Sequence, residues 1–221
     1  MSRISVVGGH GNVARHLHSL LVAAGHTPVA LVRREEYRAE LEGLGAEVRL
    51  LDIERSDTAA FARVFEGSHA VVFAAGGGPD GNLERKRTVD LEGSLKSIEG
   101  ARRAGISRFV QVSAIGVDNP LPPDTDPVWR AYVEAKRDSD AALRASDLDW
   151  TIVRPGLLTD GPPTGLVDLG PDVDRGEVPR ADVAAVLAAL IDTGAGIGAQ
   201  WSLVSGDTPV AEAVRQSVRP E

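Results

Sequence analysis

The chain has 221 residues, a formal net charge of −8, 43% hydrophobic residues and 25% charged residues. This length and composition predict a single globular domain over residues 1–221 with a substantial buried core. The acidic balance argues against nucleic-acid binding, and the absence of cysteine excludes disulfides, thiolate metal sites and cysteine nucleophiles.

Short apolar runs alternate with segments of helical periodicity from the first residues onward. The predicted strands cover residues 4–7, 29–32, 47–51, 70–74, 108–113, 150–154 and 200–204. The predicted helices cover residues 12–24, 35–44, 58–65, 82–104, 129–145 and 181–191. Because most of these strands are apolar throughout, we expect an α/β fold in which helices cover both faces of a parallel sheet.

Two segments interrupt the alternation of strands and helices. Residues 118–128 contain four prolines, and residues 155–176 are rich in glycine and proline. Each segment follows the C-terminal end of a predicted strand, which is the edge where open α/β sheets bind ligands. We therefore expect both segments to be small substrate loops of the same domain.

A glycine-containing loop joins the first predicted strand to the first predicted helix. Gly8 permits a tight turn, Gly11 lets the backbone approach a pyrophosphate, and Ala14 keeps the helix close to the strand. The start of the helix offers free N–H groups to phosphates, whereas a tight turn without a ligand is the alternative. The cofactor contacts predicted in this loop are Gly8, Gly9, His10, Gly11, Asn12 and Val13.

Arg33 and Arg34 follow the second strand, where an NAD-preferring site usually carries a carboxylate. A guanidinium group can hold a 2′-phosphate in a bidentate manner, so these arginines favour NADP(H) over NAD(H). The neighbouring Glu35 and Glu36 weaken this effect. The alternative is that both arginines are solvated surface charges.

The third and fourth strands end in further candidate cofactor residues. Asp52 and Ile53 follow the third strand, where the Asp52 carboxylate could accept a hydrogen bond from the adenine amine or could instead cap the loop. Ala74, Ala75 and Gly76 follow the fourth strand and would let a cofactor lie against the backbone. A flexible loop is the alternative for these small residues.

Tyr132 and Lys136 are four residues apart on one predicted helix and therefore share a face. A free phenol has a pKa of about 10, and a nearby ammonium group favours the phenolate and lowers that pKa toward neutrality. Ser113, at the end of the fifth strand, could donate a hydrogen bond to a substrate carbonyl. The pattern predicts a proton-transfer group, although an ordinary surface tyrosine is the alternative.

These motifs together resemble the short-chain dehydrogenase/reductase superfamily, and in particular its atypical branch of compact NAD(P)H-binding, NmrA-like and epimerase-like proteins. The motifs that carry the resemblance lie at residues 6–14, 112–116, 132–136, 149–156, 179–184 and 205–209. The resemblance implies a Rossmann-type sheet with strand order 3-2-1-4-5-6-7. It also implies that Tyr132 transfers a proton, that Lys136 assists it and contacts the cofactor, and that Ser113 orients the substrate. It places four further residues beside the nicotinamide: Pro155, Gly156, Leu157 and Leu158.

One position departs from the pattern of this superfamily. Asp90 lies where better-characterised members carry an asparagine that holds a water for proton relay, so it is the fourth candidate catalytic residue. The expected function is hydride transfer between NADP(H) and a small carbonyl, alcohol or quinone-like substrate. The alternatives are a non-catalytic NADP(H) sensor, a flavin or pigment reductase, and a sugar-nucleotide epimerase or dehydratase.

The expected partner is a small-molecule substrate, and the sequence is compatible with both a monomer and a homodimer. Apolar runs are too short for a membrane span or a signal peptide, which favours a cytoplasmic protein without membrane partners. The histidines lack the spacing of metal ligands, so we expect no metal site.

Overall fold

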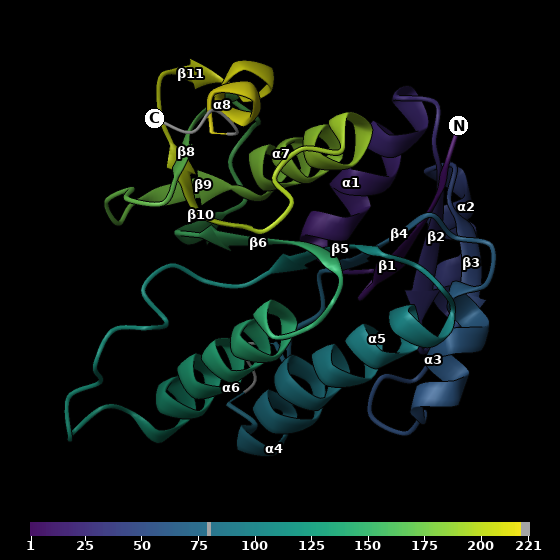
Figure 1. Cartoon of the computed structure of the whole chain (residues 1–221), viewed down its shortest axis with the longest axis horizontal. Helices are drawn as coiled ribbons and strands as arrows, with labels where there is room; N and C mark the ends of the chain where they lie inside the picture. Colours follow the sequence, from purple (N-terminus) through teal and green to yellow (C-terminus); the bar gives the residue numbers. More distant parts are fainter. Residues whose placement is uncertain (79–80, 218–221) are drawn as a thin grey trace.

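A mostly parallel sheet runs through the molecule, and helices cover both of its faces (Figure 1). The computed structural model describes residues 1–78 and 81–217. The strands are β1 (Arg3–Val7), β2 (Thr27–Val32), β3 (Glu47–Leu50), β4 (Ala70–Phe73), β5 (Arg108–Val112), β6 (Asp149–Pro155), β7 (Leu157–Thr159), β8 (Leu166–Gly170), β9 (Glu177–Pro179), β10 (Ala199–Ser205) and β11 (Thr208–Pro209). The helices are α1 (Asn12–Ala23), α2 (Arg38–Gly43), α3 (Thr58–Phe65), α4 (Leu83–Arg85), α5 (Glu92–Arg103), α6 (Pro127–Arg144), α7 (Arg180–Thr193) and α8 (Val210–Gln216), with a 3-10 turn η1 (Glu35–Tyr37) and a π-helix η2 (Lys86–Leu91).

The order of the strands across the main sheet is β11-β8-β10-β6-β5-β4-β1-β2-β3. Its parallel part, from β3 to β10, has the order 3-2-1-4-5-6-7 and confirms the expected Rossmann-type α/β fold. Strands β8 and β11 extend one edge of the sheet: β8 pairs antiparallel with β10, and β11 pairs antiparallel with β8.

Side chains of the central strands alternate between two hydrophobic cores. Ile4 and Val6 of β1 pack in the core beneath α1 and α7, whereas Val7 packs with Phe61 and Phe109 in the core beneath α3, α5 and α6. Figure 1 shows these two helical layers on opposite sides of the sheet. Burial of both faces explains why the strands read as nearly continuous apolar runs.

Two predicted segments differ from the structure. The helix expected over residues 82–104 is divided into α4, the π-helix η2 and α5. The segment 155–176, expected to be a loop, contains β7 and β8, and β8 belongs to the main sheet. Edge strands rich in glycine and proline carry little hydrophobic periodicity, which explains why they were not predicted.

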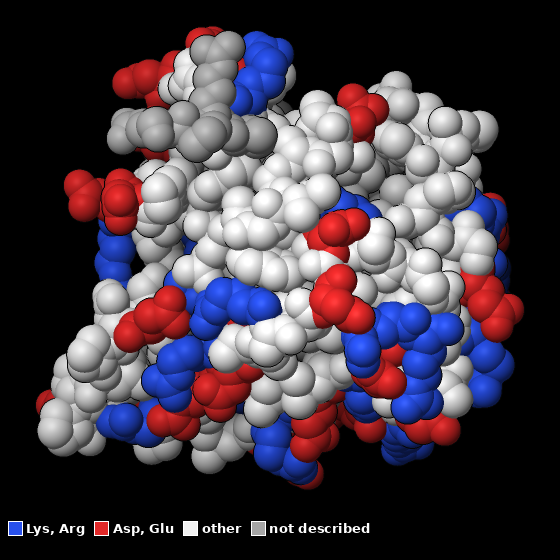
Figure 2. All heavy atoms as spheres, in the orientation of Figure 1, with Lys and Arg blue, Asp and Glu red and all other residues white. Residues whose placement is uncertain are grey.

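Within residues 1–78 and 81–217, no helix is long and apolar enough to cross a membrane. Figure 2 shows acidic and basic side chains intermingled over the lower half of the view, where α5 and α6 lie. Arg102 and Arg103, for example, both pair with Glu99 on α5. Charges of both signs are therefore interspersed on this face of the molecule.

Candidate active site

The carboxyl ends of β1 to β4 surround a cavity of about 270 Å³. Its position matches the edge at which doubly wound sheets bind ligands. Nine residues predicted to bind the cofactor line this cavity: Gly8, His10, Gly11, Arg33, Asp52, Ile53, Ala74, Ala75 and Gly76. Sequence reasoning missed Leu31, Val32, Tyr37, Leu51, Glu54, Arg85 and Val89, which complete the lining.

The glycine loop packs closely against its own backbone and against the loop after β4, at the N-terminus of helix α1. Gly8 has a φ of 79°, and a Cβ atom built on it would lie 2.7 Å from the Cα atom of Ala75. A Cβ atom on Gly11 would lie 3.1 Å from the carbonyl oxygen of Gly8. Gly11 is also the N-cap of α1, and no side chain caps this helix. The free N–H groups and the absent side chains fit the pyrophosphate of a dinucleotide.

Arg33 lies on the cavity wall together with an acidic residue that the sequence did not single out. The Arg33 Nη1 atom is 3.9 Å from a carboxylate oxygen of Glu54, and the Arg85 Nε atom is 3.7 Å from the same oxygen. Thr88 also donates a hydrogen bond of 2.8 Å to Glu54. Arg33 is therefore placed to meet a 2′-phosphate, while Glu54 competes for its charge.

Arg34, which was predicted to bind the cofactor, does not line the cavity. Its Nη1 atom donates a 3.0 Å hydrogen bond to Glu36, and its guanidinium lies 5.9 Å from the centroid of the Tyr37 ring. Tyr37 itself lines the cavity and stacks on His10, with ring centroids 3.7 Å apart. The stacked pair therefore forms part of the wall at the glycine loop.

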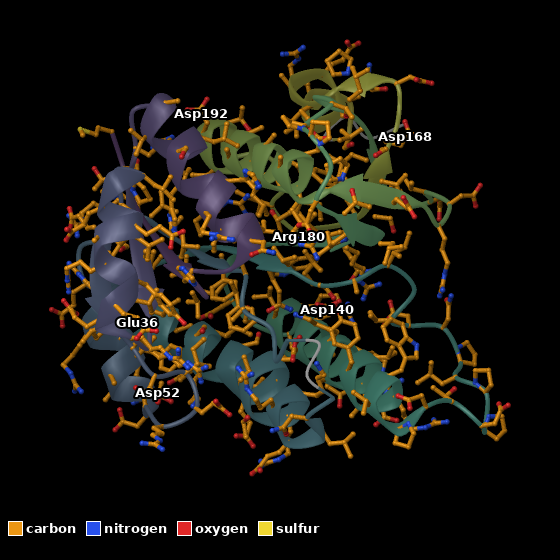
Figure 3. All side chains as sticks on the ribbon, turned by 180° about the vertical axis from the view of Figure 1, so that it is seen from behind. Glu36, Asp52, Asp140, Asp168, Arg180 and Asp192 are labelled. Carbon is orange, nitrogen blue, oxygen red and sulfur yellow. The ribbon has the colours of Figure 1, made fainter. Side chains whose placement is uncertain are left out.

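Asp52 both lines the cavity and caps the turn that follows β3. Its Oδ1 atom accepts hydrogen bonds from the backbone N–H groups of Glu54 and Arg55 at 3.0 and 3.2 Å. Figure 3 shows Asp52 at this end of the crevice. Asp52 therefore caps the loop in the structure, as the alternative predicted, and its Oδ1 atom is already hydrogen-bonded to the backbone.

The remaining predicted cofactor residues lie outside the lining of this cavity. A Cβ atom on Gly9 would lie 2.8 Å from the Cα atom of Ala30, so Gly9 is needed for packing against β2. Asn12 accepts a hydrogen bond from Arg15, and Val13 is buried in the core. The other residues outside the lining are Arg34, Lys136, Pro155, Gly156, Leu157 and Leu158. Their contact with a cofactor stays a prediction.

Tyr132 and Lys136 lie on α6, and the Lys136 Nζ atom lies 3.5 Å from the carbonyl oxygen of Ala75, a residue of the cavity lining. This helix begins at Pro127, and the Asp126 side chain caps its first turn by accepting a hydrogen bond from the N–H of Trp129. The Lys136 Nζ atom lies 6.0 Å from the centroid of the Tyr132 ring. Lys136 is almost fully buried and donates to the carbonyl oxygen of Val112 at 3.2 Å.

Asp90 forms a buried ion pair with Lys136. One Asp90 carboxylate oxygen lies 3.3 Å from the Lys136 Nζ atom, and the other accepts a 2.8 Å hydrogen bond from the N–H of Gly77. Asp90 belongs to η2, and π-helical turns occur frequently at functional sites because they reorient side chains within a helix. The departure from asparagine therefore places a carboxylate directly on the candidate catalytic lysine.

The pKa of Tyr132 is raised, whereas the sequence analysis expected it to be lowered. Burial raises this pKa, Lys136 lowers it, and the nearby carboxylates of Asp90 and Asp140 raise it again. Burial alone would lower the pKa of Lys136, but Asp90 and Tyr132 outweigh burial and raise it. The phenol therefore keeps its proton at neutral pH, and the lysine stays charged.

Ser113 hydrogen-bonds to a buried carboxylate that the sequence analysis did not identify. Its hydroxyl donates to Asp140 at 2.7 Å, and Figure 3 shows Asp140 on α6. Gln111 donates to the other oxygen of Asp140 at 2.8 Å. Arg154 donates two hydrogen bonds to Asp140, at 2.9 and 2.8 Å, and one to Asp118 at 2.6 Å. Ser113 would have to exchange partners before it could donate to a substrate.

Comparison with known proteins agrees with the fold and with the cavity. The model of a family described as NAD(P)H-binding matches residues 8–194. The chain belongs to this NAD(P)H-binding family. This match, together with relatives named as epimerases and NAD-dependent epimerase/dehydratases, confirms the resemblance to the atypical short-chain dehydrogenase/reductase branch.

This chain aligns with three relatives over nearly the whole length of both proteins. The "Uncharacterized sugar epimerase YhfK" of Bacillus subtilis is 37% identical over 215 residues, which cover 97% of this chain and 99% of YhfK. The structure of a "Putative NAD-dependent epimerase/dehydratase" from Bacillus halodurans is 40% identical, has a TM-score of 0.90 and covers 98% of this chain and 100% of its own. The anaerobilin reductase ChuY from Escherichia coli O157:H7 is 26% identical, with a TM-score of 0.76 and coverage of 93% and 98%.

Within the part of the chain that the structure describes, no group of three or more histidine, aspartate or glutamate residues is arranged to hold a metal ion. The ionisable residues of the crevice instead form pairs and hydrogen-bonded networks. The candidate site therefore has two parts: the cavity at the carboxyl ends of β1 to β4, and the group of Tyr132, Lys136 and Asp90.

Proposed function

We propose that this protein is an NADP(H)-dependent reductase of small carbonyl compounds, in which Tyr132 donates the proton. The observation that carries this proposal is the combination of a glycine loop at the uncapped N-terminus of α1 with Tyr132 beside the buried Lys136, where burial raises the pKa of Tyr132. A relative named as a reductase is compatible with this chemistry.

The preference for NADP(H) over NAD(H) rests on Arg33. This residue lines the cavity at the end of β2, where the 2′ position of the adenosine ribose lies in a Rossmann-type site. Its guanidinium is held only loosely by Glu54, at 3.9 Å, and is available to a phosphate. The cavity lining contains no other residue at the end of β2 that carries a full positive charge.

The raised pKa of Tyr132 favours a role as proton donor in carbonyl reduction. When bound, NADPH supplies a hydride to the carbonyl carbon and leaves as NADP⁺. The Tyr132 hydroxyl donates its proton to the carbonyl oxygen, so the substrate becomes an alcohol and solvent restores the proton. A raised pKa suits a proton donor, whereas alcohol oxidation and epimerisation require the phenolate as a base.

The test is NADPH oxidation over a panel of aldehydes, ketones, 2-oxo acids and quinones, with free flavins included. We expect Tyr132→Phe to lower kcat by about 100-fold or more, because a positioned general acid contributes at least that much. Asp138→Asn is the matched control, since Asp138 is an exposed residue of the same helix that pairs only with Arg137. Unchanged turnover in Tyr132→Phe would contradict the assignment of Tyr132 and favour a flavin or pigment reductase.

A non-catalytic NADP(H) sensor is the second candidate function. This function is supported by the Asp90–Lys136 ion pair, because the Asp90 carboxylate offsets part of the positive charge of Lys136 that would stabilise a Tyr132 phenolate. A sensor would bind NADPH, consume none with any substrate of the panel, and bind a partner protein in a cofactor-dependent manner.

A further inference from the structure

Lys86 is a second buried lysine beside Tyr132, and the sequence did not single it out. Its side chain is 6% exposed, and its Nζ atom lies 5.7 Å from the centroid of the Tyr132 ring. Lys136 approaches the same ring at 6.0 Å. Two ammonium groups therefore lie next to one phenol at the candidate reaction centre.

The two lysines differ in their partners. Lys136 is paired with Asp90, and the nearby Arg154 is paired with Asp140 and Asp118. Among the residues that the structure describes, Lys86 has no carboxylate within ion-pair distance and donates only to the carbonyl oxygen of Gly78. An ammonium group has three N–H donors, so a single backbone carbonyl leaves most of its capacity unused.

Among the described residues, Lys86 is thus a buried cation without a counter-ion, which is costly and calls for an explanation. Lys86 opens the π-helix η2, which also contains Asp90, and both side chains are buried. By contrast, the adjacent Arg87 is exposed and pairs with Glu84 and Glu92. Lys86 is therefore buried at the start of η2, whereas the side chain of its neighbour Arg87 reaches solvent.

We propose that Lys86 forms an anion subsite for the substrate, so that the protein acts on carbonyl compounds that carry a carboxylate or another oxyanion near the reacting carbonyl. The proposal rests on the proposed reductase function, because it places the carbonyl at Tyr132. An oxyanion at Lys86 would supply the missing counter-ion and would hold the carbonyl beside the Tyr132 hydroxyl. Charge-assisted hydrogen bonds of this kind are among the stronger polar contacts in proteins.

The first experiment compares 2-oxo and 3-oxo acids with their methyl esters as substrates for NADPH oxidation. We expect the acids to be favoured in kcat/KM by about 10- to 100-fold, the range for a hydrogen bond to a charged group. Lys86→Met should reduce this preference to nearly one, Lys86→Arg should retain much of it, and Arg87→Met should leave it unchanged. Phosphorylated ketones form a separate arm that distinguishes a phosphate from a carboxylate.

The second experiment measures binding without turnover. Calorimetric titration of the protein–NADPH complex with oxalate and with benzoate should show binding to the parent and none to Lys86→Met. Neutral benzamide should bind the parent and Lys86→Met equally. The NADPH affinity and the Tm of Lys86→Met report whether this variant is folded. If Lys86→Met does not fold, Lys86→Arg replaces it.

Failure of the inference and failure of the reductase function give different results. Equal turnover of acids and esters, both lost in Tyr132→Phe, would overturn the anion subsite and leave the reductase intact. Binding of oxalate or benzoate that depends on Lys86, without NADPH oxidation on any carbonyl, would support the subsite and count against the reductase. No binding of either anion to the parent complex would overturn the subsite regardless of activity.

Discussion

The Lys136 ammonium lies 3.3 Å from the Asp90 carboxylate, and the two opposite charges meet next to Tyr132. This pair explains why the lysine does not lower the pKa of the phenol as far as its position alone would suggest. Burial raises that pKa first, and Asp90 and Asp140 add to the increase. The balance of charges therefore determines whether Tyr132 acts as an acid or as a base.

Asp90→Asn should shift the pH dependence of carbonyl reduction to lower pH. Removal of the carboxylate removes a group that raises the pKa of Tyr132, so the phenol loses its proton at lower pH. Because reduction requires the protonated phenol, the alkaline decline of kcat should begin at lower pH than in the parent. The measurement is kcat against pH for both proteins, with Asp138→Asn as control. An unchanged alkaline limb would contradict the role given to Asp90.

Asp140→Ala should destabilise the fold more than Asp118→Ala. Asp140 is fully buried and accepts two hydrogen bonds from Arg154, whereas the Asp118 side chain is 49% exposed. Loss of Asp140 leaves a buried guanidinium without its main partner and should lower the free energy of unfolding by about 3–5 kcal/mol. Loss of Asp118 should cost about 1 kcal/mol or less.

Urea denaturation of the two variants checks this difference. The NADPH affinity of Asp118→Ala reports whether its fold is intact. Equal destabilisation by both substitutions would show that Arg154 is held chiefly by other contacts.

The parallel strands could be predicted because buried strands appear in the sequence as continuous apolar runs, whereas their order was implied by the family resemblance. Val71, Val72 and Phe73 of β4, for example, are buried and consecutive, and the glycine that ends α1 marks a boundary. The edge strands β8 and β11 and the helix α8 have no continuous apolar run or clear helical periodicity in the sequence. The π-helix η2 was also not predicted, because one inserted residue barely changes helical periodicity.

Gly8→Ala and Gly11→Ala should separate stability from cofactor binding. Gly8 has a positive φ and lies against the backbone of Ala75, so an alanine there should lower the free energy of unfolding by about 2–3 kcal/mol. Gly11 has a φ of −66°, which alanine adopts without strain. Its methyl group would instead occupy the phosphate cradle and should weaken NADPH binding by about tenfold.

Thermal unfolding and NADPH fluorescence titration measure the two effects. A Gly11→Ala protein that binds NADPH as tightly as the parent would show that the backbone at Gly11 does not approach the cofactor. A Gly8→Ala protein of unchanged Tm would show that the loop can relax around a side chain.

The candidate site was only partly predictable, because charged residues in helices and strands usually lie on the surface. Tyr132 and Lys136 were found through their spacing, whereas Lys86 and Asp140 have no comparable pattern around them. Arg154 carried a usable signal, since a charged residue at the end of an apolar strand needs a buried partner. Glu54 could not be assigned from the sequence, because its contact with Arg33 depends on how β2 and β3 end side by side.

The most direct test of the cofactor site is a fluorescence titration of the parent, Arg33→Gln and Arg34→Gln with NADPH and with NADH. Arg33 lines the cavity, and Arg34 is paired with Glu36 outside it. We predict that the parent prefers NADPH, that Arg33→Gln weakens NADPH binding by about 10- to 100-fold with little effect on NADH, and that Arg34→Gln changes neither. Equal affinity of the parent for the two cofactors, or an equal effect of the two substitutions, would contradict the assignment of Arg33 to the 2′-phosphate.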